Sequence, residues 1–469
     1  MQHDCVAVLD VGKTLSKLSI WSEDNVLLER RVHRNSRVLE GGIPVLDTKG
    51  ITFWLAQTLA VYSRLARISA IVPVGHGAAA CIVDEQKLLA TPLDYEAEPP
   101  SEITDRYRSI RDPFEITGSP ALPMCLNLGV QLFWREFVDP DRMRRGTIVT
   151  WPQYWAWRLC GVAATEVTSL GCHTDLWMPI RRSPSPLAVA RGWADRLAPV
   201  HLATDVLGTV TKEWQERCGL PADCAVVCGI HDSNSALHAT RAYPEIEGRE
   251  CTVLSTGTWF VAMRTLGATE RFGSVLVPEN RDCLINCDVA GRPVPSSRFM
   301  GGRELELLEA SIGEPADPSS NAETFESIAL TLARAGVFAL PSFNKGVGPF
   351  PNHLGRWILR PADQIGRRAI AGLYLALMAD TSLNLIGSRE ALVIEGRFGS
   401  DPIFTRALAS LRPKQTVHLS DPNHSIPLGA IRLVRPNAPP QCNLRKVQPM
   451  PGELPEYAAK WSALAQISD

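Results

Sequence analysis

The sequence predicts an α/β protein built from two similar domains that face one another across a ligand cleft. At 469 residues the chain is too long for a single core of ordinary size. A strand, a glycine turn with hydroxyl side chains and a second strand occur over residues 6–22, and the same arrangement recurs over residues 248–264. Apolar strand-like runs and helical patterns then follow in both halves. A repeated supersecondary unit at the start of each half therefore indicates two related domains.

The first strand ends at a carboxylate. Residues 6–11 are β-branched and apolar, as in a buried strand, and residues 18–22 and 26–32 continue as two further strands of a meander. Asp10 stands where the strand ends. The turn after it carries one glycine, two amines and two hydroxyls: Gly12, Lys13, Thr14, Ser16 and Lys17. A carboxylate for Mg²⁺ beside donors for phosphate oxygens is typical of polyphosphate binding. Taken alone, the stretch also fits a hairpin with a polar turn.

The ending Gly12-Lys13-Thr14 is also the ending of a P-loop, but the rest of that motif is missing. A P-loop needs a glycine-rich loop before a helix. Here residues 8–11 are strand, Ala7 stands where the first glycine belongs, and another strand follows. The P-loop interpretation is therefore rejected.

A histidine follows the next strand. An amphipathic pattern predicts a helix over residues 50–66, and residues 68–74 predict a buried strand that ends in Gly75-His76-Gly77. His76 and Gly77 are placed to meet a ligand, although a histidine that caps a turn is an equally good interpretation. Residues 94–199, rich in Trp and Pro, are expected to form an insertion that shapes a pocket.

A second carboxylate stands between the two hairpins. Residues 225–228 predict a strand, and His231-Asp232 follow it directly before a helix. Ligands of open α/β sheets collect at such strand ends, and helix N-termini attract anionic groups. An N-cap role alone for Asp232 is the alternative. The domain boundary is expected after residue 243, giving domains 1–243 and 244–469.

The second half supplies three glycine-bearing segments. The turn Thr256-Gly257-Thr258 joins two strands, a loop over residues 295–302 with Gly301 and Gly302 leads into a helix near Glu304, and Gly396, Phe398, Gly399 and Ser400 follow a strand over residues 392–395. The other expected elements are a strand over 336–341, a loop over 344–356, and helices over 369–386 and from 401 onward. The proline-rich tail beyond residue 436 is expected to be peripheral.

Composition excludes several classes of protein. Apolar residues make up 45% and charged residues 21%, and the net charge of −2 gives no footprint for nucleic acid or an anionic membrane. We expect neither a transmembrane segment nor a signal peptide. The 12 Cys residues are spread through strand-like and helix-like segments without zinc-knuckle spacing. They predict free buried thiols in a protein of the reducing cytoplasm.

In this order the segments resemble the motifs of the FGGY carbohydrate kinases, within the actin-like ATPase superfamily. Residues 10–17 are similar to the first phosphate motif, and residues 229–232 to the catalytic-aspartate motif. Residues 255–259 are similar to the second phosphate motif, and residues 395–400 to the adenosine motif. Each match alone is weak, but four in the right order over nearly the whole chain are specific. The resemblance implies two actin-like (ribonuclease H-like) domains, with ATP and a sugar meeting in the cleft.

The resemblance also implies roles for individual residues. Asp232 is expected to be the general base, Lys17 to stabilise the transferring phosphoryl group, and Asp10 to organise Mg²⁺. His76, Gly77 and His231 are expected to contact the sugar in the first domain. The residues expected to hold ATP are Gly12, Lys13, Thr14, Thr256, Gly257, Thr258, Gly301, Gly302, Gly396, Phe398, Gly399 and Ser400. Two departures stand out: Lys13 replaces the usual hydroxyl residue, and Arg397-Phe398 interrupts a glycine-rich loop, where Phe398 either packs on the base or fills core.

The sequence thus predicts an ATP-dependent kinase for a small sugar. Residues 231–232 and 255–259 are most similar to the rhamnulose and fuculose kinases, which favours a ketose or deoxyketose. A kinase for a pentitol or tetritol, and a catalytically silent sugar- or nucleotide-binding protein on the same fold, are the alternatives. An actin- or chaperone-like ATPase fits less well, because the Asp232 segment and the pocket insertion resemble those of sugar kinases. The oligomeric state is left open, with a homodimer as one alternative.

Overall fold

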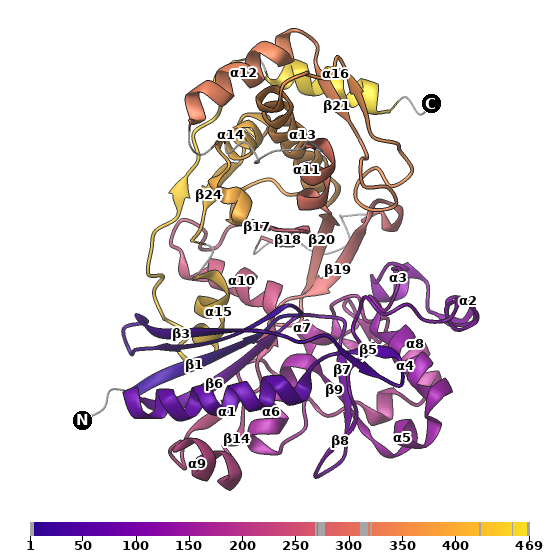
Figure 1. Cartoon of the computed structure of the whole chain (residues 1–469), viewed down its shortest axis with the longest axis vertical. Coiled ribbons are helices and arrows are strands. Elements are labelled where there is room, and N and C mark those ends of the chain that lie inside the picture. Colours follow the sequence, from indigo (N-terminus) through magenta and orange to yellow (C-terminus); the bar gives the residue numbers. More distant parts are fainter. Residues whose placement is uncertain are drawn as a thin grey trace. The chain divides into compact units, whose positions relative to one another are not determined.

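The computed structural model describes residues 4–267, 270, 277–309, 318, 321–421, 424–452 and 454–466. Contacts divide the chain into two compact units (Figure 1). Unit 1 comprises Met1–Ala242, Ile285–Pro293 and Ser425–Gln441; unit 2 comprises Tyr243–Leu284, Val294–His424 and Cys442–Asp469. The division expected from the sequence differs in one respect, because it assigned the two later segments of unit 1 to the second domain.

Unit 1 is built on a mixed seven-stranded sheet. Its order is β14-β15-β6-β1-β2-β3, and β16 also pairs with β6. The strands are β1 (Asp4–Val11), β2 (Leu15–Trp21), β3 (Leu27–Arg34), β6 (Arg67–Gly75), β14 (Val206–Thr209), β15 (Ala225–Val227) and β16 (Ile230–His231). β1 runs antiparallel to β2 and parallel to β6. The predicted three-stranded meander is therefore confirmed, and β6 places its carboxyl end beside that of β1.

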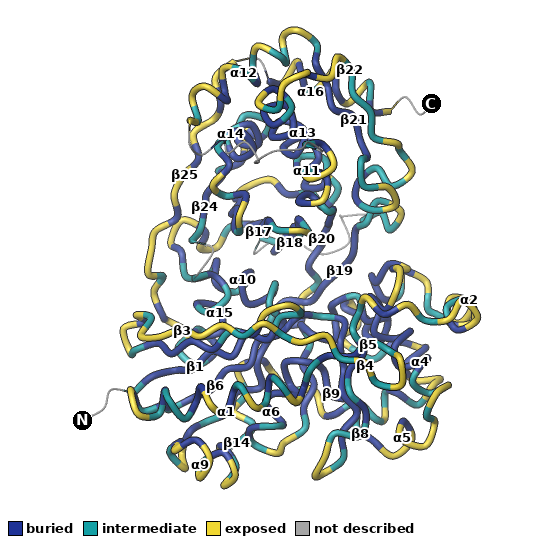
Figure 2. The backbone as a smooth tube through the Cα atoms, in the orientation of Figure 1, coloured by how far each residue is buried: buried dark blue, intermediate teal, exposed yellow. Residues whose placement is uncertain are grey.

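The central strand β1 is buried on both faces, as its unbroken apolar run predicts. Ala7 and Leu9 pack in a cluster with the helices α1 (Thr48–Leu65), α6 (Trp151–Cys160) and α9 (Lys212–Cys218). Val6 and Val8 belong to the cluster on the opposite face, which includes residues of α15 (Ser425–Val434). Figure 2 shows the sheet strands β1 and β6 as largely buried. β1 is therefore packed between helices on both faces of the sheet.

A separate core cluster in unit 1 combines part of residues 94–199, the expected insertion, with residues 80–93 before it, whereas α6 from within that range packs against the main sheet. The cluster contains a three-stranded sheet of order β8-β7-β9, and its buried side chains form a core of their own. Its main elements are β7 (Ala80–Val83), β8 (Leu88–Ala90), α2 (Ser101–Ile110), α3 (Phe114–Thr117), α4 (Leu128–Val138), α5 (Pro140–Arg145), β9 (Thr147–Thr150), α7 (Val167–Leu170) and α8 (Pro186–Ala190). Short two-stranded pairs complete unit 1: β4 (Val38–Glu40) with β5 (Ile43–Val45), β10 (Thr165–Glu166) with β13 (Val200–His201), and β11 (Trp177–Met178) with β12 (Ser183–Pro184).

Unit 2 repeats the strand order of unit 1. Its sheet has the order β19-β20-β18-β17-β23-β24-β25. The strands are β17 (Cys251–Thr256), β18 (Phe260–Thr265), β19 (Cys283–Cys287), β20 (Pro293–Phe299), β23 (Ala391–Gly396), β24 (Thr416–Leu419) and β25 (Arg445–Lys446). β17 pairs antiparallel with β18 and parallel with β23, as β1 does with β2 and β6. The repeated hairpin predicted from the sequence is confirmed.

The helices of unit 2 enclose one large apolar core. They are α11 (Gly301–Glu309), α12 (Ala322–Arg334), α13 (Gln364–Leu385), α14 (Pro402–Leu411) and α16 (Leu454–Ala465), and β21 (Phe338–Leu340) pairs with β22 (Arg356–Ile358). α13 lies at the centre of the group in Figure 1, and most of its residues are buried. This explains its nearly uniform apolar sequence, because a helix surrounded by protein has no solvent face.

The loop predicted over residues 295–302 is wrong. Residues up to Phe299 are the strand β20, which pairs with β18, and α11 begins directly at Gly301. The serines and arginine of this stretch suggested a loop, but they are buried with partners. Arg298, for example, donates from Nε to Asp282 Oδ1 at 2.7 Å. Polar residues with satisfied hydrogen bonds are compatible with a buried strand.

The prediction of a peripheral tail beyond residue 436 is also wrong. β25 adds a strand to the sheet of unit 2, and α16 packs into its core. Trp461 is 1% exposed and donates from Nε1 to Ala339 O at 2.7 Å. The prolines before α16 shaped the prediction, but they only delimit the helix.

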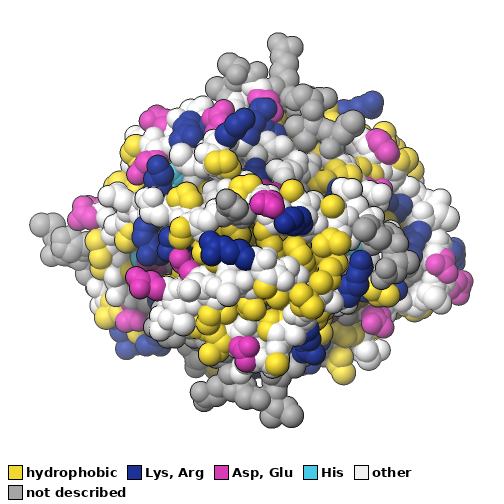
Figure 3. Space-filling model, turned by 90° about the horizontal axis from the view of Figure 1, so that it is seen from above, with side chains coloured by type: hydrophobic (Ala, Val, Ile, Leu, Met, Phe, Trp, Pro, Cys, Tyr) yellow, Lys and Arg dark blue, Asp and Glu magenta, His cyan; other side chains and the backbone are white. Residues whose placement is uncertain are grey.

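Three further features agree with the composition. All 12 Cys residues are free thiols, and all but Cys160 and Cys442 are buried. Within the described part of the chain, no helix has the length and apolar character needed to cross a bilayer. The face in Figure 3 carries basic, acidic and hydrophobic side chains interspersed, as the small net charge leads one to expect.

Candidate functional site

Three parallel strands of unit 1 end together and bring the predicted sugar-side residues to one edge. In the parallel register of β1 and β6, Asp10 is opposite Val74 and Val11 is opposite Gly75. In the register of β16 and β6, His231 is opposite Gly75. Asp10, His76 and Asp232 are therefore neighbours at the carboxyl edge of the sheet, although they are far apart in the sequence.

Asp10 is a buried carboxylate with one amine beside it. It is 9% exposed, and Lys17 Nζ on the adjacent strand lies 3.3 Å from its Oδ2. Burial raises the pKa of Asp10, the positive charge of Lys17 lowers it, and the nearby charge of Asp232 raises it again. The pKa of Asp10 is raised overall, and Lys17 is the main group that opposes this rise.

Asp232 is the first residue of α10 (Asp232–Ala239), directly after β16. Its Oδ1 accepts a hydrogen bond from Ser233 N at 2.5 Å and lies 3.3 Å from His231 Nε2. Asn234 Nδ2 lies 3.2 Å from His231 Nδ1, and Cys172 Sγ lies 3.4 Å from His231 Nε2. Burial lowers the pKa of His231, which keeps the ring neutral. Among the described residues all hydrogen bonds to Asp232 go to Oδ1, which leaves Oδ2 as an acceptor for a ligand.

His76 also offers an acceptor. Its Nδ1 donates to Gly77 O at 2.6 Å, and its buried Nε2 has no partner among the described atoms. Burial lowers the pKa of His76, so the unprotonated Nε2 accepts rather than donates. Gly77 is required here because a Cβ at this position would lie 2.5 Å from Cys172 Sγ. The close packing of Gly77 against Cys172 fixes the position of the His76 ring.

The turn over residues 12–14 is held by side chains from other elements. Asn35 Nδ2 donates to Gly12 O at 2.8 Å and to Lys13 O at 3.0 Å. Lys13 Nζ lies 3.0 Å from Asp94 Oδ1 and 4.5 Å from the centre of the Tyr95 ring. Lys13 therefore ties the turn to the insertion, while Thr14 is exposed.

The predicted nucleotide-side segments lie side by side within unit 2. Thr256 at the end of β17 is opposite Gly396 at the end of the parallel strand β23. Thr256 Oγ1 donates to Glu395 O at 2.5 Å and accepts from Phe398 N at 3.2 Å. Gly396 has a φ of +86°, and a Cβ there would lie 2.1 Å from Thr256 O. Only glycine allows the two strand ends to approach this closely.

The N-terminus of α11 completes this cluster. A Cβ at Gly302 would lie 2.5 Å from Gly257 O and 3.0 Å from Thr258 Cα, and Gly302 N donates to Thr258 O at 3.2 Å. A Cβ at Gly301 would collide with the ring of Phe260. The two glycines thus let the start of α11 lie against the turn over residues 256–258. Positive potential at a helix start beside an exposed turn suits an anion.

The loop after β23 divides into core and surface residues. Phe398 is 4% exposed, and its ring lies 4.8 Å from that of Phe260. Gly399 is half-buried and Ser400 is exposed. Phe398 therefore anchors the loop in the core, and Gly399 and Ser400 are the accessible part of it.

Comparisons with known proteins agree with this arrangement. The family profile described as "Carbohydrate kinase FGGY, C-terminal domain" matches residues 248–441. The crystal structure of a carbohydrate kinase from Novosphingobium aromaticivorans is 45% identical, with 99% of each chain covered and a TM-score of 0.94. The chain belongs to the FGGY carbohydrate kinases. It is thus an ATP-dependent sugar kinase, and the predicted fold class, two actin-like α/β domains, is confirmed.

Two more distant relatives of this FGGY kinase are informative in different ways. The xylulose kinase from Rhodospirillum rubrum shares 17% identity and a TM-score of 0.76 over 98% of each chain, which shows the common fold. A rhamnulokinase from Ligilactobacillus salivarius (strain UCC118) is 27% identical over 158 residues, which are 33% of this chain and 31% of that protein. The family and the fold are therefore shown, whereas the particular sugar is not.

Sequence reasoning did not single out several residues that hold the site of this FGGY kinase. Trp151 Nε1 donates to Val11 O at 3.0 Å, and Gln153 Nε2 donates to Gly229 O at 3.2 Å. Both lie at the start of α6, and together with Asn35 and Asn234 they fix the strand ends. The sequence shows that residues 94–199 are rich in Trp, but no local motif assigns a partner to any of these tryptophans.

Proposed function

We propose that this FGGY kinase transfers the γ-phosphoryl group of ATP to a hydroxyl of a ketose or deoxyketose of the rhamnulose, fuculose or pentulose type, with Asp232 as the general base. The observation that carries the proposal is the convergence of Asp10, His76 and Asp232 at one strand edge of unit 1. The acceptors of Asp232 and His76 suit the hydroxyls of a polyhydroxylated substrate. Asp10, with the amine of Lys17 beside it, suits the metal ion and the phosphate of the nucleotide.

The role of Asp232 follows from its contacts. A sugar hydroxyl is a weak nucleophile at neutral pH, and a positioned base accelerates its attack by roughly 10²–10⁴. The Oδ1 of Asp232 is fixed by Ser233 and His231, so the free Oδ2 accepts the hydroxyl proton. The neutral Nε2 of His76 accepts a hydrogen bond from another hydroxyl of the sugar and so orients it.

Asp10 fits the Mg²⁺ that accompanies the nucleotide. Mg²⁺ in phosphoryl-transfer sites is bound through one or two carboxylates, with phosphate oxygens and waters as the other ligands. No cluster of three metal-ligating side chains occurs among the described residues, and Asp10, with the amine of Lys17 beside it, is a single carboxylate of the required kind. The ion neutralises phosphate charge. Lys17 adds a second positive charge for the transferring group.

The nucleotide is assigned to unit 2. There Thr258 in the turn over residues 256–258 and Ser400 after β23 are exposed hydroxyl residues, and the half-buried Gly399 lies beside Ser400. In unit 1, Gly12 and Thr14 hold the phosphates, while Lys13 acts through the turn because it is already paired with Asp94. The preference for a ketose or deoxyketose rests on the motif similarity and on the partial match to a rhamnulokinase.

The experiment is a substrate screen combined with a base variant. Purified protein is tested for ADP release with ketoses, deoxyketoses, aldoses, pentitols and tetritols. We expect the highest kcat/KM with a ketose or deoxyketose. Asp232→Asn should lower kcat on that sugar by at least about 10², with little change in the KM for ATP. The matched control, Asp195→Asn on the exposed surface of unit 1, should retain full activity.

Two results would contradict the proposal. A best substrate among the pentitols or tetritols would overturn the sugar assignment. A folded Asp232→Asn enzyme with normal kcat would remove the general-base role and leave Asp232 as a helix cap, whose loss by Asp232→Ala costs about 1 kcal/mol of stability.

A further inference from the structure

Unit 1 contains a cationic groove that none of the residues of the kinase site line. It has a volume of about 760 Å³ and lies between the start of α1, the β7–β8 hairpin, α5, the end of α6 and α9. These elements are all labelled in Figure 1. The groove has one acidic lining residue, Glu40. Its basic lining residues are Lys49, Lys87, Arg142, Arg145, Arg158 and Arg217.

Helix stability explains only part of this charge. The four arginines of the groove stand in the last turns of α5, α6 and α9, where a cation interacts favourably with the helix dipole. Lys49 stands in the first turn of α1, where a cation is unfavourable and where no acidic residue occurs within the turn. Lys87 lies in the turn of the β7–β8 hairpin, outside any helix. Lys49 and Lys87 therefore do not stabilise a helix C-terminus.

Half of the cations also lack a counter-charge. Arg142 Nε lies 3.1 Å from Asp139 Oδ2, and Arg158 and Arg217 lie 3.9 and 4.0 Å from one carboxylate oxygen of Glu213. Within the described ranges, no acidic side chain forms an ion pair with Lys49, Lys87 or Arg145. Concave surfaces of one charge concentrate counter-ions, so the groove attracts anions.

The walls restrict the kind of anion. The ring of Phe53 is 58% exposed, and Tyr154 and Trp157 are buried aromatic residues of the lining. The hydroxyl of Thr52 donates to Thr48 O at 2.7 Å, so the basic side chains are the main polar groups open to a ligand. Ammonium and guanidinium groups recognise phosphate oxygens. An exposed aromatic ring gives a surface for a sugar face or a base.

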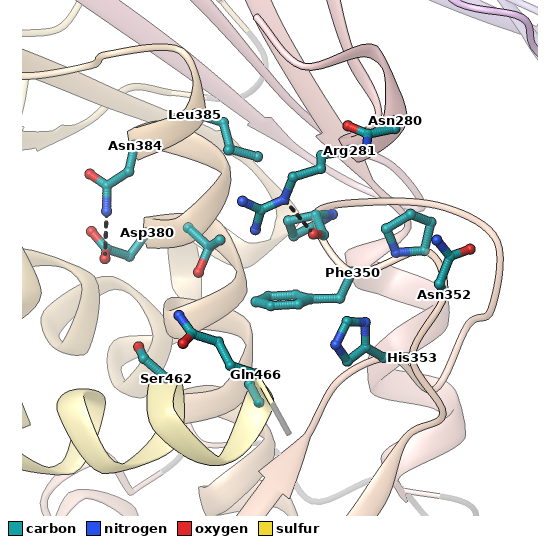
Figure 4. A pocket seen from close by; sticks show the side chains of 14 residues that line it. Asn280, Arg281, Phe350, Asn352, His353, Asp380, Asn384, Leu385, Ser462 and Gln466 are labelled. Atoms are coloured by element: carbon teal, nitrogen blue, oxygen red, sulfur yellow. Dashed lines mark hydrogen bonds between the residues drawn. The ribbon is translucent and has the colours of Figure 1, made fainter. Parts of the chain in front are cut away.

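A pocket in unit 2 provides a contrast (Figure 4). Its charged groups are already engaged: Arg281 Nε donates to Pro349 O at 2.8 Å, and Asp380 accepts from Asn384 and pairs with Arg412 at 2.6 Å. Charged side chains that already have protein partners are poor binding groups for a ligand. In the groove, Arg145 Nε donates to Asp141 O at 3.3 Å, but Lys49 and Lys87 have no ion pair among the described residues, and these two lysines distinguish the groove from this pocket.

We propose that the cationic groove is a second ligand site, which binds a small organic molecule carrying two or more phosphate groups. The phosphates lie against Lys49, Lys87 and Arg145, and the organic part lies against Phe53. A nucleoside diphosphate and a sugar bisphosphate share this chemistry. The site is separate from the kinase site, because Asp10, Lys17 and Asp232 are not among its lining residues.

Lysine acetylation of the full-length protein tests the proposal residue by residue. The protein is labelled with an acetylating reagent with and without tripolyphosphate, ADP or ribulose 1,5-bisphosphate, and the modified peptides are quantified by mass spectrometry. Lys49 and Lys87 report on the groove, Lys13 and Lys17 on the kinase site, and the exposed Lys212 of α9 on non-specific effects. We expect tripolyphosphate to protect Lys49 and Lys87 and to leave Lys212 unchanged. Stronger protection by ADP or by the bisphosphate identifies the source of the phosphates.

Binding to variants gives the second measurement. Lys49→Gln/Lys87→Gln removes two exposed cations without removing any ion pair among the described residues, so the fold is retained. Titration calorimetry with tripolyphosphate measures the effect, and the groove component of binding should be about tenfold weaker in this variant than in the wild type. Lys212→Gln, the matched control, should bind like the wild type.

Three outcomes would overturn the proposal. One is protection by tripolyphosphate confined to Lys13 and Lys17, which would mean that only the kinase site binds phosphates. Another is equal protection of Lys212, which would mean non-specific condensation of the anion. The third is protection of the groove lysines by a short oligonucleotide but by none of the small phosphates, which would make the groove a nucleic-acid surface.

Discussion

Lys17 and Asp10 face each other across the first hairpin. They are register partners in the antiparallel pair β1–β2, and Lys17 Nζ donates to Asp10 Oδ2 at 3.3 Å. The carboxylate is buried, and burial raises its pKa, whereas the amine lowers it. Lys17 thus both opposes the rise in the pKa of Asp10 and adds a cation beside it.

Lys17→Met should lower kcat by about 10²–10³, because it removes the positive charge that we propose stabilises the transferring phosphoryl group. The pKa of Asp10 should rise further, since the group that lowers it is gone. The acid limb of the pH–rate profile should therefore move to higher pH. Steady-state kinetics between pH 5 and 9 measure both effects. Lys17→Arg keeps the charge and should recover most of the activity; a Lys17→Met enzyme with the kcat and pH profile of the wild type would contradict the assignment.

His76→Phe should weaken sugar recognition without unfolding the protein. The variant removes an Nε2 that accepts from the sugar and has no described protein partner. One such hydrogen bond is worth about 0.5–1.5 kcal/mol, so kcat/KM for the sugar should fall about 2- to 10-fold while the KM for ATP stays constant. Thermal unfolding serves as the control and should change little. A fall in stability with unaltered kinetics would show that His76 only caps the turn after β6.

Gly302→Ala should weaken nucleotide binding. The new Cβ would lie 2.5 Å from Gly257 O and 3.0 Å from Thr258 Cα, and backbone atoms cannot rotate away as a side chain can. Overpacking of this kind costs about 1–3 kcal/mol, which should displace the turn and raise the KM for ATP about tenfold or more. Gly208→Ala in β14 is the matched control, since its Cβ would meet only ordinary contacts. Equal ATP kinetics in both variants would argue against a nucleotide role for this turn.

Glu166→Gln should change how stability depends on pH. Burial raises the pKa of Glu166 to about 7, although Thr168 Oγ1 and the amides of Thr168 and Ser169 oppose the shift. The folded state then binds a proton that the unfolded state has released, so this group makes stability fall as the pH rises from about 4.5 to 7. The loss amounts to about 3 kcal/mol above pH 7.

The glutamine variant is neutral throughout, so this part of the pH dependence should disappear and the variant should be the more stable protein at pH 8. Urea unfolding at several pH values measures it, with the exposed Glu115→Gln as the control. A slope equal to that of the wild type would mean that Glu166 is ionised in the folded protein at neutral pH.

Local patterns were enough to predict the hairpins and the strand ends. The run of apolar residues before Asp10, and the glycines after it, are properties of a short stretch, and the same holds for the hairpin around Gly257. The position of Asp232 followed because a strand and a helix start are both visible in the sequence beside it. Each of these depends on period and turn chemistry alone.

Partners from distant parts of the chain were not predictable in this way. Asn35 holds the first turn, and Gln153 donates to the backbone of Gly229, but no local pattern connects these residues. The strand β20 was missed for a related reason. Ser297 Oγ donates to Ser382 O at 2.9 Å, so a residue that reads as polar in the sequence is satisfied in the core by a residue far along the chain.

The return of α15 to unit 1 has a consequence for how the protein is made. Ala430 and Ile431 pack in one cluster with Val6 and Val8 of the first sheet. Gly429 lets α15 lie directly against α10, because a Cβ there would lie 1.8 Å from Ser235 O. A ribosome that adds about 5–20 residues per second takes on the order of ten to forty seconds to pass from residue 242 to residue 441. During that time the nascent first unit exposes an apolar sheet face. A fragment that ends at residue 242 would keep that face exposed permanently and should aggregate.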